Sequence, residues 1–409
     1  MASFSTLTIE EATERLIDYR GKTPPKTDSG IRLVTAKVVK SGQIHDDPAE
    51  FIAADFYDEW MRRGLPKKLD VLLTTEAPLG EVAILRHDAR IALAQRIILL
   101  RANPELLDPL FLFYALQSSF GQGELRARAS GTTVLGIKQS ELRKVRIPVC
   151  PLPIQRRIAG ILSTYDELIE NNERRIKILE AMVRAIYCEW FVHFRFPSFG
   201  SATFIESEKG NIPEGWALKA LGSVGTMALG GTPSRKVNAY WTNGDIPWLK
   251  SGALNATRVI SASEYITKDA LASSATKLLP RKAVVVAITG AILVSYLEIE
   301  ACANQSVIGI YNLEGVGSEY LHLLLEQNIK ALENLMTGSA QQHINKEVLG
   351  AVKILVPPAS LMQSFLGQAT PIYEQISALL FATENLRRTR DLLLPRLFSG
   401  ELDVEASAA

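Results

Sequence analysis

The sequence lacks the features that mark a membrane-bound or secreted protein. It contains no run of about 20 apolar residues, the length that a membrane-spanning helix needs. Residues 1–16, MASFSTLTIEEATERL, carry acidic side chains and no apolar run, so they do not resemble a signal peptide. The three cysteines show no Cys-x-x-Cys spacing, which is typical of proteins in a reducing compartment. We therefore expect a cytoplasmic protein that does not bind membranes.

Signatures of catalysis are also missing. Residues 130–138, SGTTVLGIK, lack the Gly-Lys-Ser/Thr sequence that ends a Walker A loop. The five histidines are scattered without the spacing of a zinc site, and no Gly-x-Ser-x-Gly motif occurs. We expect a chain that is not an enzyme and that holds no metal and no cofactor of its own. A single-subunit nuclease is the weakest alternative.

Charge does not identify a partner either, because the formal net charge is only +1. A site for a polyanion must therefore be a local patch. The chain has 409 residues, of which 47% are hydrophobic and 22% charged. These values predict two to three globular domains with sizeable cores.

An internal repeat organises the chain. In the same order along both halves, residues 21–24 match 230–233, 66–75 match 280–289, 94–100 match 304–310, and 130–149 match 337–356. Each half then passes through a proline cluster into a long helical pattern. The period is too long for a solenoid, so we interpret the chain as two copies of a domain followed by a helix. Two similar domains suit a long, quasi-symmetric polymer better than a small ligand.

Both helical patterns carry a column of mostly apolar residues at every seventh position. The columns are Ile158, Tyr165, Asn172, Leu179 and Ile186 in the first copy and Phe365, Ile372, Leu379, Leu386 and Leu393 in the second. We expect helices over about 153–190 and 361–397 that pair antiparallel as a rigid rod of about 50 Å, or roughly 15 base pairs of DNA. The alternative is that each helix packs on its own domain.

Two details of this helical pair stay open in the sequence. Asn172 either fixes the register of the pair or faces solvent. Pro371 marks either the start of the second helix or a bend in it.

Three segments resemble the specificity subunits of type I restriction-modification enzymes. Residues 230–252, GGTPSRKVNAYWTNGDIPWLKSG, resemble the start of many target recognition domains in that family. Residues 151–197 resemble its central conserved region, and residues 386–404, LRRTRDLLLPRLFSGELDV, resemble its C-terminal conserved region. The resemblance covers essentially the whole length of the chain.

The resemblance implies a mixed α/β fold with two similar target recognition domains, separated by a long antiparallel helical pair and related by a pseudo-two-fold axis. We predict the first recognition domain at 1–152, a central spacer helix at 153–193, a linker and the second recognition domain at 194–357, and a C-terminal spacer helix and tail at 358–409. Each domain would read half of a split sequence in double-stranded DNA.

The same resemblance implies the partners. Two modification subunits, which are methyltransferases, would dock around the helices, bind S-adenosylmethionine and methylate adenine. Restriction subunits, which combine a motor and a nuclease, would cut the DNA. The chain itself would contribute specificity and no catalysis.

Candidate DNA-binding residues follow from the side-chain chemistry of the matched loops. Lysine and arginine suit phosphates or guanine, glutamine and asparagine suit adenine, and hydroxyls donate or accept. In the first copy the candidates are Lys22, Thr23, Lys26, Lys37, Lys40, Arg128 and Lys138. In the second copy they are Thr232, Ser234, Arg235, Lys236, Lys250, Ser251, Gln341, Gln342, Asn345 and Lys346.

Other readings remain for these segments. Trp241 and Trp248 are expected to anchor their loop in a core more than to stack on bases. Arg387, Arg388 and Arg390 are open between helix-face charges, DNA-backbone contacts and partner contacts. For the chain as a whole, the alternative is a protein-interaction scaffold that binds no DNA and uses its duplicated domains to hold partners.

Overall fold

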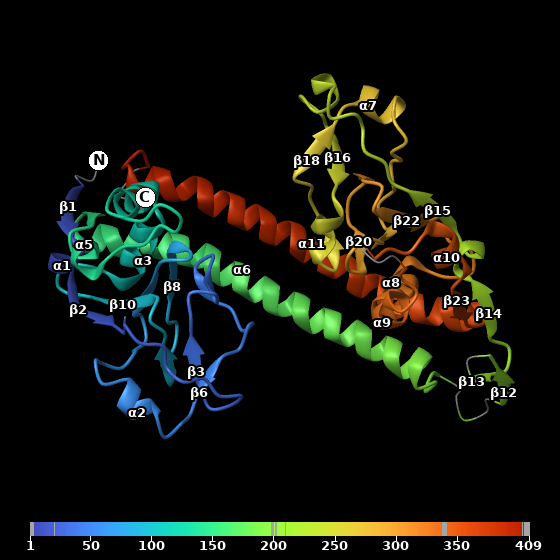
Figure 1. Cartoon of the computed structure of the whole chain (residues 1–409), viewed down its shortest axis with the longest axis horizontal. Coiled ribbons are helices and arrows are strands. Elements are labelled where there is room, and N and C mark those ends of the chain that lie inside the picture. Colours follow the sequence, from blue (N-terminus) through green and yellow to red (C-terminus); the bar gives the residue numbers. More distant parts are fainter. Residues whose placement is uncertain are drawn as a thin grey trace. The chain divides into compact units, whose positions relative to one another are not determined.

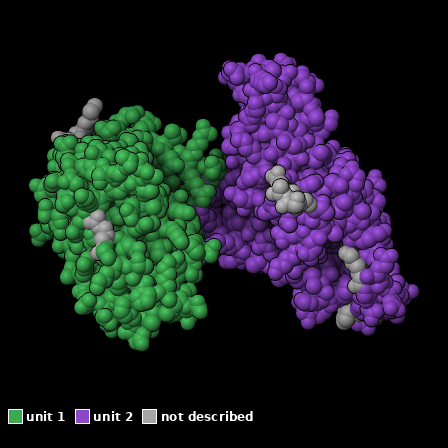
Figure 2. Space-filling view, viewed as in Figure 1, with its two compact units in different colours: residues 1–170, 384–409 green, residues 171–383 purple. Residues whose placement is uncertain are grey.

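The computed structural model describes residues 4–19, 21–197, 200, 203–208, 210–337, 342–402 and 404. It forms two compact units, which Figure 2 shows in different colours. Unit 1 comprises residues 1–170 and 384–409, and unit 2 comprises residues 171–383. Both unit boundaries fall inside long helices, α6 (Leu152–Tyr187) and α11 (Ala359–Phe398). The four predicted domain ranges stay a prediction, because the units follow packing and not sequence order.

Unit 1 is built on the four-stranded antiparallel sheet β2-β10-β7-β8 (Figure 1). Its strands are β1 (Ser5–Thr8), β2 (Thr13–Asp18), β3 (Ile31–Val34), β4 (Val39–Lys40), β5 (Gln43–Ile44), β6 (Phe51–Ile52), β7 (Val71–Thr75), β8 (Leu79–Ile84), β9 (Ile91–Leu93), β10 (Ile97–Ala102) and β11 (Arg146–Val149). Its short helices are α1 (Ile9–Ala12), α2 (Tyr57–Trp60), α3 (Pro109–Gln117), α4 (Ser119–Ala127) and α5 (Gln139–Leu142).

The central sheet of unit 1 is buried on both faces. Because side chains alternate along a strand, Val71 and Leu73 of β7 pack on the side of α3, where they meet Phe111. Leu72 between them packs on the opposite side with Leu33 of the small sheet β6-β3-β9. The result is three layers: helices, central sheet and small sheet.

Unit 2 repeats this plan. Its strands are β12 (Phe204–Ser207), β13 (Gly210–Pro213), β14 (Ala217–Ala220), β15 (Thr226–Leu229), β16 (Ile246–Leu249), β17 (Arg258–Val259), β18 (Glu264–Ile266), β19 (Val284–Ala287), β20 (Leu293–Leu297), β21 (Cys302–Ala303), β22 (Val307–Tyr311) and β23 (Lys353–Val356). Its short helices are α7 (Lys268–Ala272), α8 (Ser318–Gln327), α9 (Ile329–Glu333) and α10 (Lys346–Ala351).

The strand order confirms the internal repeat. The main sheet β15-β22-β19-β20 of unit 2 corresponds to β2-β10-β7-β8, and β17 extends it by one strand. The small sheet β18-β16-β21 corresponds to β6-β3-β9, and in both the last pair is parallel. The pair β14-β23 corresponds to β1-β11. The predicted mixed α/β fold with duplicated domains is therefore correct.

One detail of the sequence match is wrong by one residue. Aligning 66–75 with 280–289 places Val71 opposite Val285. In the sheets, Val71 pairs with Leu100, and the matching residue Ile310 pairs with Val284. Val71 therefore corresponds to Val284. Both strands are apolar on both faces, so the sequence carries no alternation that would fix the register.

The long helices pair antiparallel, as predicted. In unit 1 the start of α6 and the end of α11 share one core, where Ile158 clusters with Phe398. In unit 2 Ile176 of α6 packs against Ile376 and Leu379 of α11. The alternative, in which each helix packs on its own domain, is also partly correct, because Ile158 of α6 packs against Phe111 of α3 as well.

The two open details of the helical pair are also answered. Asn172 is 9% exposed, so it does not face solvent. Helix α11 begins at Ala359 and continues through Pro371, which therefore does not start it. A π-helical turn, Cys188–Val192, extends α6 beyond Tyr187.

Candidate nucleic-acid interface

The loop that follows β15 in unit 2 lies tightly against the sheet. Gly230 N donates to Val307 O at 2.9 Å, and Gly231 N donates to Ala303 O at 2.8 Å. A Cβ atom on Gly230 would lie 2.1 Å from Asn304 O, and one on Gly231 would lie 2.6 Å from Thr276 N. The glycines are therefore required for close approach of two backbones.

The next residues turn the loop outward. Pro233 is buried and Thr232 is exposed, and in unit 1 Pro24 is buried and Thr23 is exposed in the same way. In each copy the proline thus fixes the loop in the domain while the threonine lies at the surface. This arrangement places a hydroxyl at the same point of both units.

The tryptophans of unit 2 support this loop. Trp248 is 2% exposed and donates its indole N–H to Gly231 O at 3.0 Å, which confirms its predicted role as an anchor. Trp241 meets it edge to face, with 5.0 Å between the ring centroids, and donates to Ser234 O at 3.2 Å. The ring of Trp241 carries the guanidinium of Arg235, 3.5 Å from its centroid.

Glu264 of β18 pairs with two of the three candidate cations in this loop. It accepts from Arg235 at 2.5 Å and also binds Lys250, whereas Lys236 is exposed. Burial alone would raise the pKa of Glu264, but the hydrogen bonds from Lys250 and Arg235 hold that pKa below its ordinary value. The carboxylate therefore stays ionised and offsets much of the local positive charge.

The matched loop of unit 1 has a similar arrangement around Glu50. Lys26 lies 2.8 Å and Lys37 3.7 Å from its carboxylate oxygens. Lys22 and Lys40 are exposed, and Lys22 lines a groove with Trp60 and Arg62.

Each unit has a pocket lined by its second predicted segment, and the first segment begins beside that pocket, at Gly21 in unit 1 and just after Leu229 in unit 2. The pocket of unit 1 is lined by Gly21, Thr75, Glu76, Gln95, Ser130, Val134, Gly136, Ile137 and Lys138. The pocket of unit 2 is lined by Leu229, Ile288, Thr289, Gln305, Ser306, His343, Ile344, Asn345, Lys346 and Glu347. Equivalent strands and loops thus form a concave site twice, which we call the unit 1 pocket and the unit 2 pocket.

Backbone contacts confirm that the two pockets are equivalent. In unit 1 the bridge partner of both Ser130 and Glu76 is Gly136, and Ile137 N donates to Thr75 O at 3.0 Å. In unit 2 the bridge partner of both Thr337 and Thr289 is His343, and Ile344 N donates to Ile288 O at 3.0 Å.

The candidates on the second segment differ in their surroundings. Lys138 occupies the N-cap position of α5, but its side chain makes no capping hydrogen bond. Asn345 occupies the same position of α10, and its side chain accepts a capping hydrogen bond from Val348 N at 2.7 Å. Arg128 lies 3.4 Å from Glu124 and 3.8 Å from Glu141.

The remaining candidates are placed as follows. Gln342 offers its backbone carbonyl to Gly290 N at 3.0 Å, and Gln341 lies outside the described residues. Ser251 begins a short 3₁₀ helix that directly follows Lys250. Lys346 lines the unit 2 pocket.

Two pocket residues, Gln95 and Gln305, are not among the candidates predicted from the sequence. Gln95 Nε2 donates to Thr23 Oγ1 at 2.9 Å, and Thr232 Oγ1 donates to Gln305 Oε1 at 2.6 Å. The signal was present, because Gln95 and Gln305 occupy the same position in the matched segments 94–100 and 304–310.

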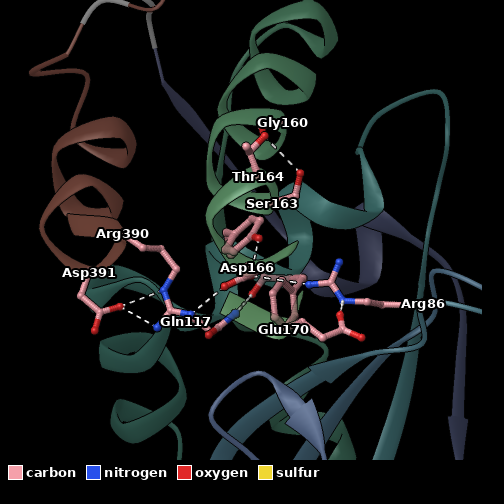
Figure 3. A network of polar contacts seen from close by, with 11 residues as sticks. Arg86, Gln117, Gly160, Ser163, Thr164, Asp166, Glu170, Arg390 and Asp391 are labelled. Atoms are coloured by element: carbon pink, nitrogen blue, oxygen red, sulfur yellow. Dashed lines mark hydrogen bonds and ion pairs between the residues drawn. The ribbon is translucent and has the colours of Figure 1, made fainter. Parts of the chain in front are cut away.

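Polar networks fix the helices to each unit. In unit 1 Asp166 of α6 accepts from Tyr114 at 2.5 Å and from Arg390 at 2.6 Å, and Arg86 lies 3.7 Å away on the other side (Figure 3). Burial and the neighbouring Asp166 raise the pKa of Tyr114 far above its ordinary value. Arg390 is therefore a charge that joins α11 to α6, which answers the question left by the sequence.

The described part of the chain contains neither a candidate metal site nor a candidate membrane span. No group of three or more His, Cys, Asp or Glu side chains there is arranged to hold a metal ion. None of the helices in the described ranges has the length and apolarity to cross a bilayer.

Two α/β units of the same topology, each holding part of the same two antiparallel helices, define a recognition subunit with duplicated domains. A family model for the type I restriction modification DNA specificity domain matches residues 38–181 and 213–364, one match in each copy. These matches cover more than half of the chain, so it belongs to this family. It is a DNA specificity subunit and is not catalytic, as the sequence predicted, and the scaffold alternative is not favoured.

Individual relatives agree with the family. The specificity subunit of the type I restriction enzyme MjaIX from Methanocaldococcus jannaschii is 27% identical over 343 residues, covering 82% of this chain and 78% of that protein. The specificity subunit of the HindI enzyme from Haemophilus influenzae is 22% identical over 400 residues, covering 82% and 87%.

A solved structure agrees with the fold. The crystal structure of the S subunit of a type I restriction-modification system from M. genitalium gives a TM-score of 0.63 at 17% identity. The match covers 97% of this chain and 96% of that one.

Proposed function

We propose that each unit reads one half of a split, asymmetric sequence in double-stranded DNA, using its pocket and the Thr-Pro loop beside it. The observation that carries this proposal is that equivalent pockets in both units are lined by the second cation-bearing or amide-bearing segment and are tied to the Thr-Pro loop by a threonine–glutamine hydrogen bond. Phosphate contacts position a protein on DNA, and side chains at base edges specify the sequence.

The chemistry of the two pockets supports different half-sites. The unit 1 pocket contains Glu76 and Lys138, whereas the corresponding positions of the unit 2 pocket are Thr289 and Asn345. A carboxylate accepts from cytosine, lysine donates to guanine, and an amide pairs with adenine. Two frameworks of the same topology with different side chains are suited to two different short sequences.

The helical pair is proposed to set the gap between the half-sites and to dock two modification subunits. A helix rises 1.5 Å per residue and resists bending, so its length defines a distance. Those subunits would bind S-adenosylmethionine and methylate adenine, and restriction subunits would complete the assembly. We also propose that this work takes place in the cytoplasm.

Selection from a random duplex library tests the proposal. The chain is assembled with its modification subunits, bound duplexes are sequenced, and methylated adenines are mapped in cells that carry the same proteins. We expect two short motifs at a fixed gap. A single contiguous motif, or no motif, would reject the proposal.

A further inference from the structure

The two pockets differ in most of their side chains but share one hydrogen-bonded pair. Thr23 binds Gln95 in unit 1 at 2.9 Å, and Thr232 binds Gln305 in unit 2 at 2.6 Å. The neighbours of the pair have changed, because Glu76 corresponds to Thr289, Arg96 to Ser306, and Lys138 to Asn345. A pair that keeps both of its members while its surroundings diverge indicates a common task.

The position of the pair defines that task. Each threonine precedes a buried proline and is itself exposed, and each glutamine lines its pocket just before a central strand, β10 or β22. The hydrogen bond therefore ties the tip of the Thr-Pro loop to the rim of the pocket. It joins the two surfaces that we propose to meet DNA.

The direction of the hydrogen bond between threonine and glutamine is opposite in the two units. Gln95 donates its amide N–H to Thr23, so its carbonyl oxygen is outside this bond. Gln305 instead accepts from Thr232, so its amide nitrogen is outside the bond. A hydroxyl both donates and accepts, so the same pair can present either an acceptor or a donor to a base edge.

We propose that Gln95 and Gln305 are specificity-determining residues, each held by its threonine so that its amide reads a base at the rim of the pocket. This inference rests on the proposed reading of DNA by both units. It adds two residues to the interface and assigns Thr23 and Thr232 a positioning role.

The test uses the complex with its modification subunits and duplexes that carry single base changes in one half-site at a time. Gln95→Ala and Thr23→Val are expected to reduce discrimination about tenfold or more at one half-site and to leave the other unchanged. Gln305→Ala and Thr232→Val should do the same at the other half-site. Thr23→Ser and Thr232→Ser keep the hydroxyl and should retain wild-type discrimination.

Gln327→Ala is the matched control, because Gln327 is exposed at the end of α8 and does not line the unit 2 pocket. Unchanged discrimination in the glutamine variants would overturn the inference. An equal loss at both half-sites would also overturn it, because it would report a general effect on folding or assembly. If the wild-type complex selects no pair of motifs, the proposed function itself fails.

Discussion

Arg258 and Glu298 form an ion pair of 2.5 Å inside unit 2, with only 4% and 2% of their side chains exposed. The guanidinium also lies 4.0 Å from the centroid of the Tyr373 ring on α11. The pair thus joins the end of the main sheet to a helix. An ion pair so deeply buried gains its attraction at a large desolvation cost, so each charge depends on the other.

Removing one member of this pair should strongly destabilise unit 2. Glu298→Ala leaves a buried guanidinium without its main counter-charge, and we expect a loss of about 3–5 kcal/mol in the free energy of unfolding. Denaturant unfolding followed by tryptophan fluorescence measures it. The double variant Arg258→Met with Glu298→Leu should be clearly more stable than Glu298→Ala, and a single variant that costs nothing would contradict the argument.

His322 should make the stability of unit 2 depend on pH. Its Nδ1 lies 2.8 Å from Tyr373 Oη, and burial lowers the pKa of His322 to about 4 from 6.5. The folded state therefore binds the proton less well than the unfolded state. The contribution of His322 to the free energy of unfolding is therefore complete above about pH 6.5. It is lost as the pH falls toward 4, and the total loss is about 3 kcal/mol.

The control for this prediction comes from the repeat. Phe113 occupies the position in α3 that His322 occupies in α8, counting from the N-caps Asp108 and Gly317. His322→Phe should therefore fold and lose this part of the pH dependence. We expect its unfolding free energy to fall less than that of the wild type between pH 7 and 5. Equal slopes in both proteins would contradict the assignment.

Gly230→Ala should disrupt the Thr-Pro loop of unit 2. The new methyl group would meet Asn304 O at 2.1 Å and Ala303 O at 2.4 Å, both backbone atoms that have little room to move. We expect a loss of recognition at the half-site read by unit 2, with the other half-site retained. Gly252→Ala is the matched control, because its Cβ would meet no atom within 4 Å.

Glu264→Gln should strengthen DNA binding without adding specificity. The substitution frees Arg235 and Lys250 from their shared counter-charge, so more positive charge faces the phosphates. We expect several-fold tighter binding at low salt. We also expect the affinity to depend more steeply on salt concentration, with a slope that corresponds to about one additional phosphate contact or more. Glu333→Gln, an exposed change on α9, should leave both quantities unchanged.

The sequence predicted the elements that depend on periodicity. The helices α6 and α11 begin and end within a few residues of the expected positions, because mostly apolar residues at heptad spacing mark a stripe that is buried or half-buried. It did not show that α11 passes through Pro371. That proline is on the exposed side of the helix, where the unpaired carbonyl of the preceding turn can be solvated.

The site was less accessible to sequence reasoning, because its contacts join distant segments. Lys138 and Gly21 line one pocket only after the sheet has assembled. The counter-charge of Arg235 comes from Glu264, 29 residues away on β18. Charge counts along the chain therefore overstate how much positive charge the loop carries at its surface.

The end of α11 and the residues after it complete the core of unit 1, where Leu397, Phe398 and Val404 pack with Phe111 and Ile158. During translation, unit 1 therefore lacks part of its interior until the ribosome has passed codon 404. A nonsense mutation between the codons for residues 200 and 390 would leave the α/β domain of unit 1 encoded in full but without these core residues.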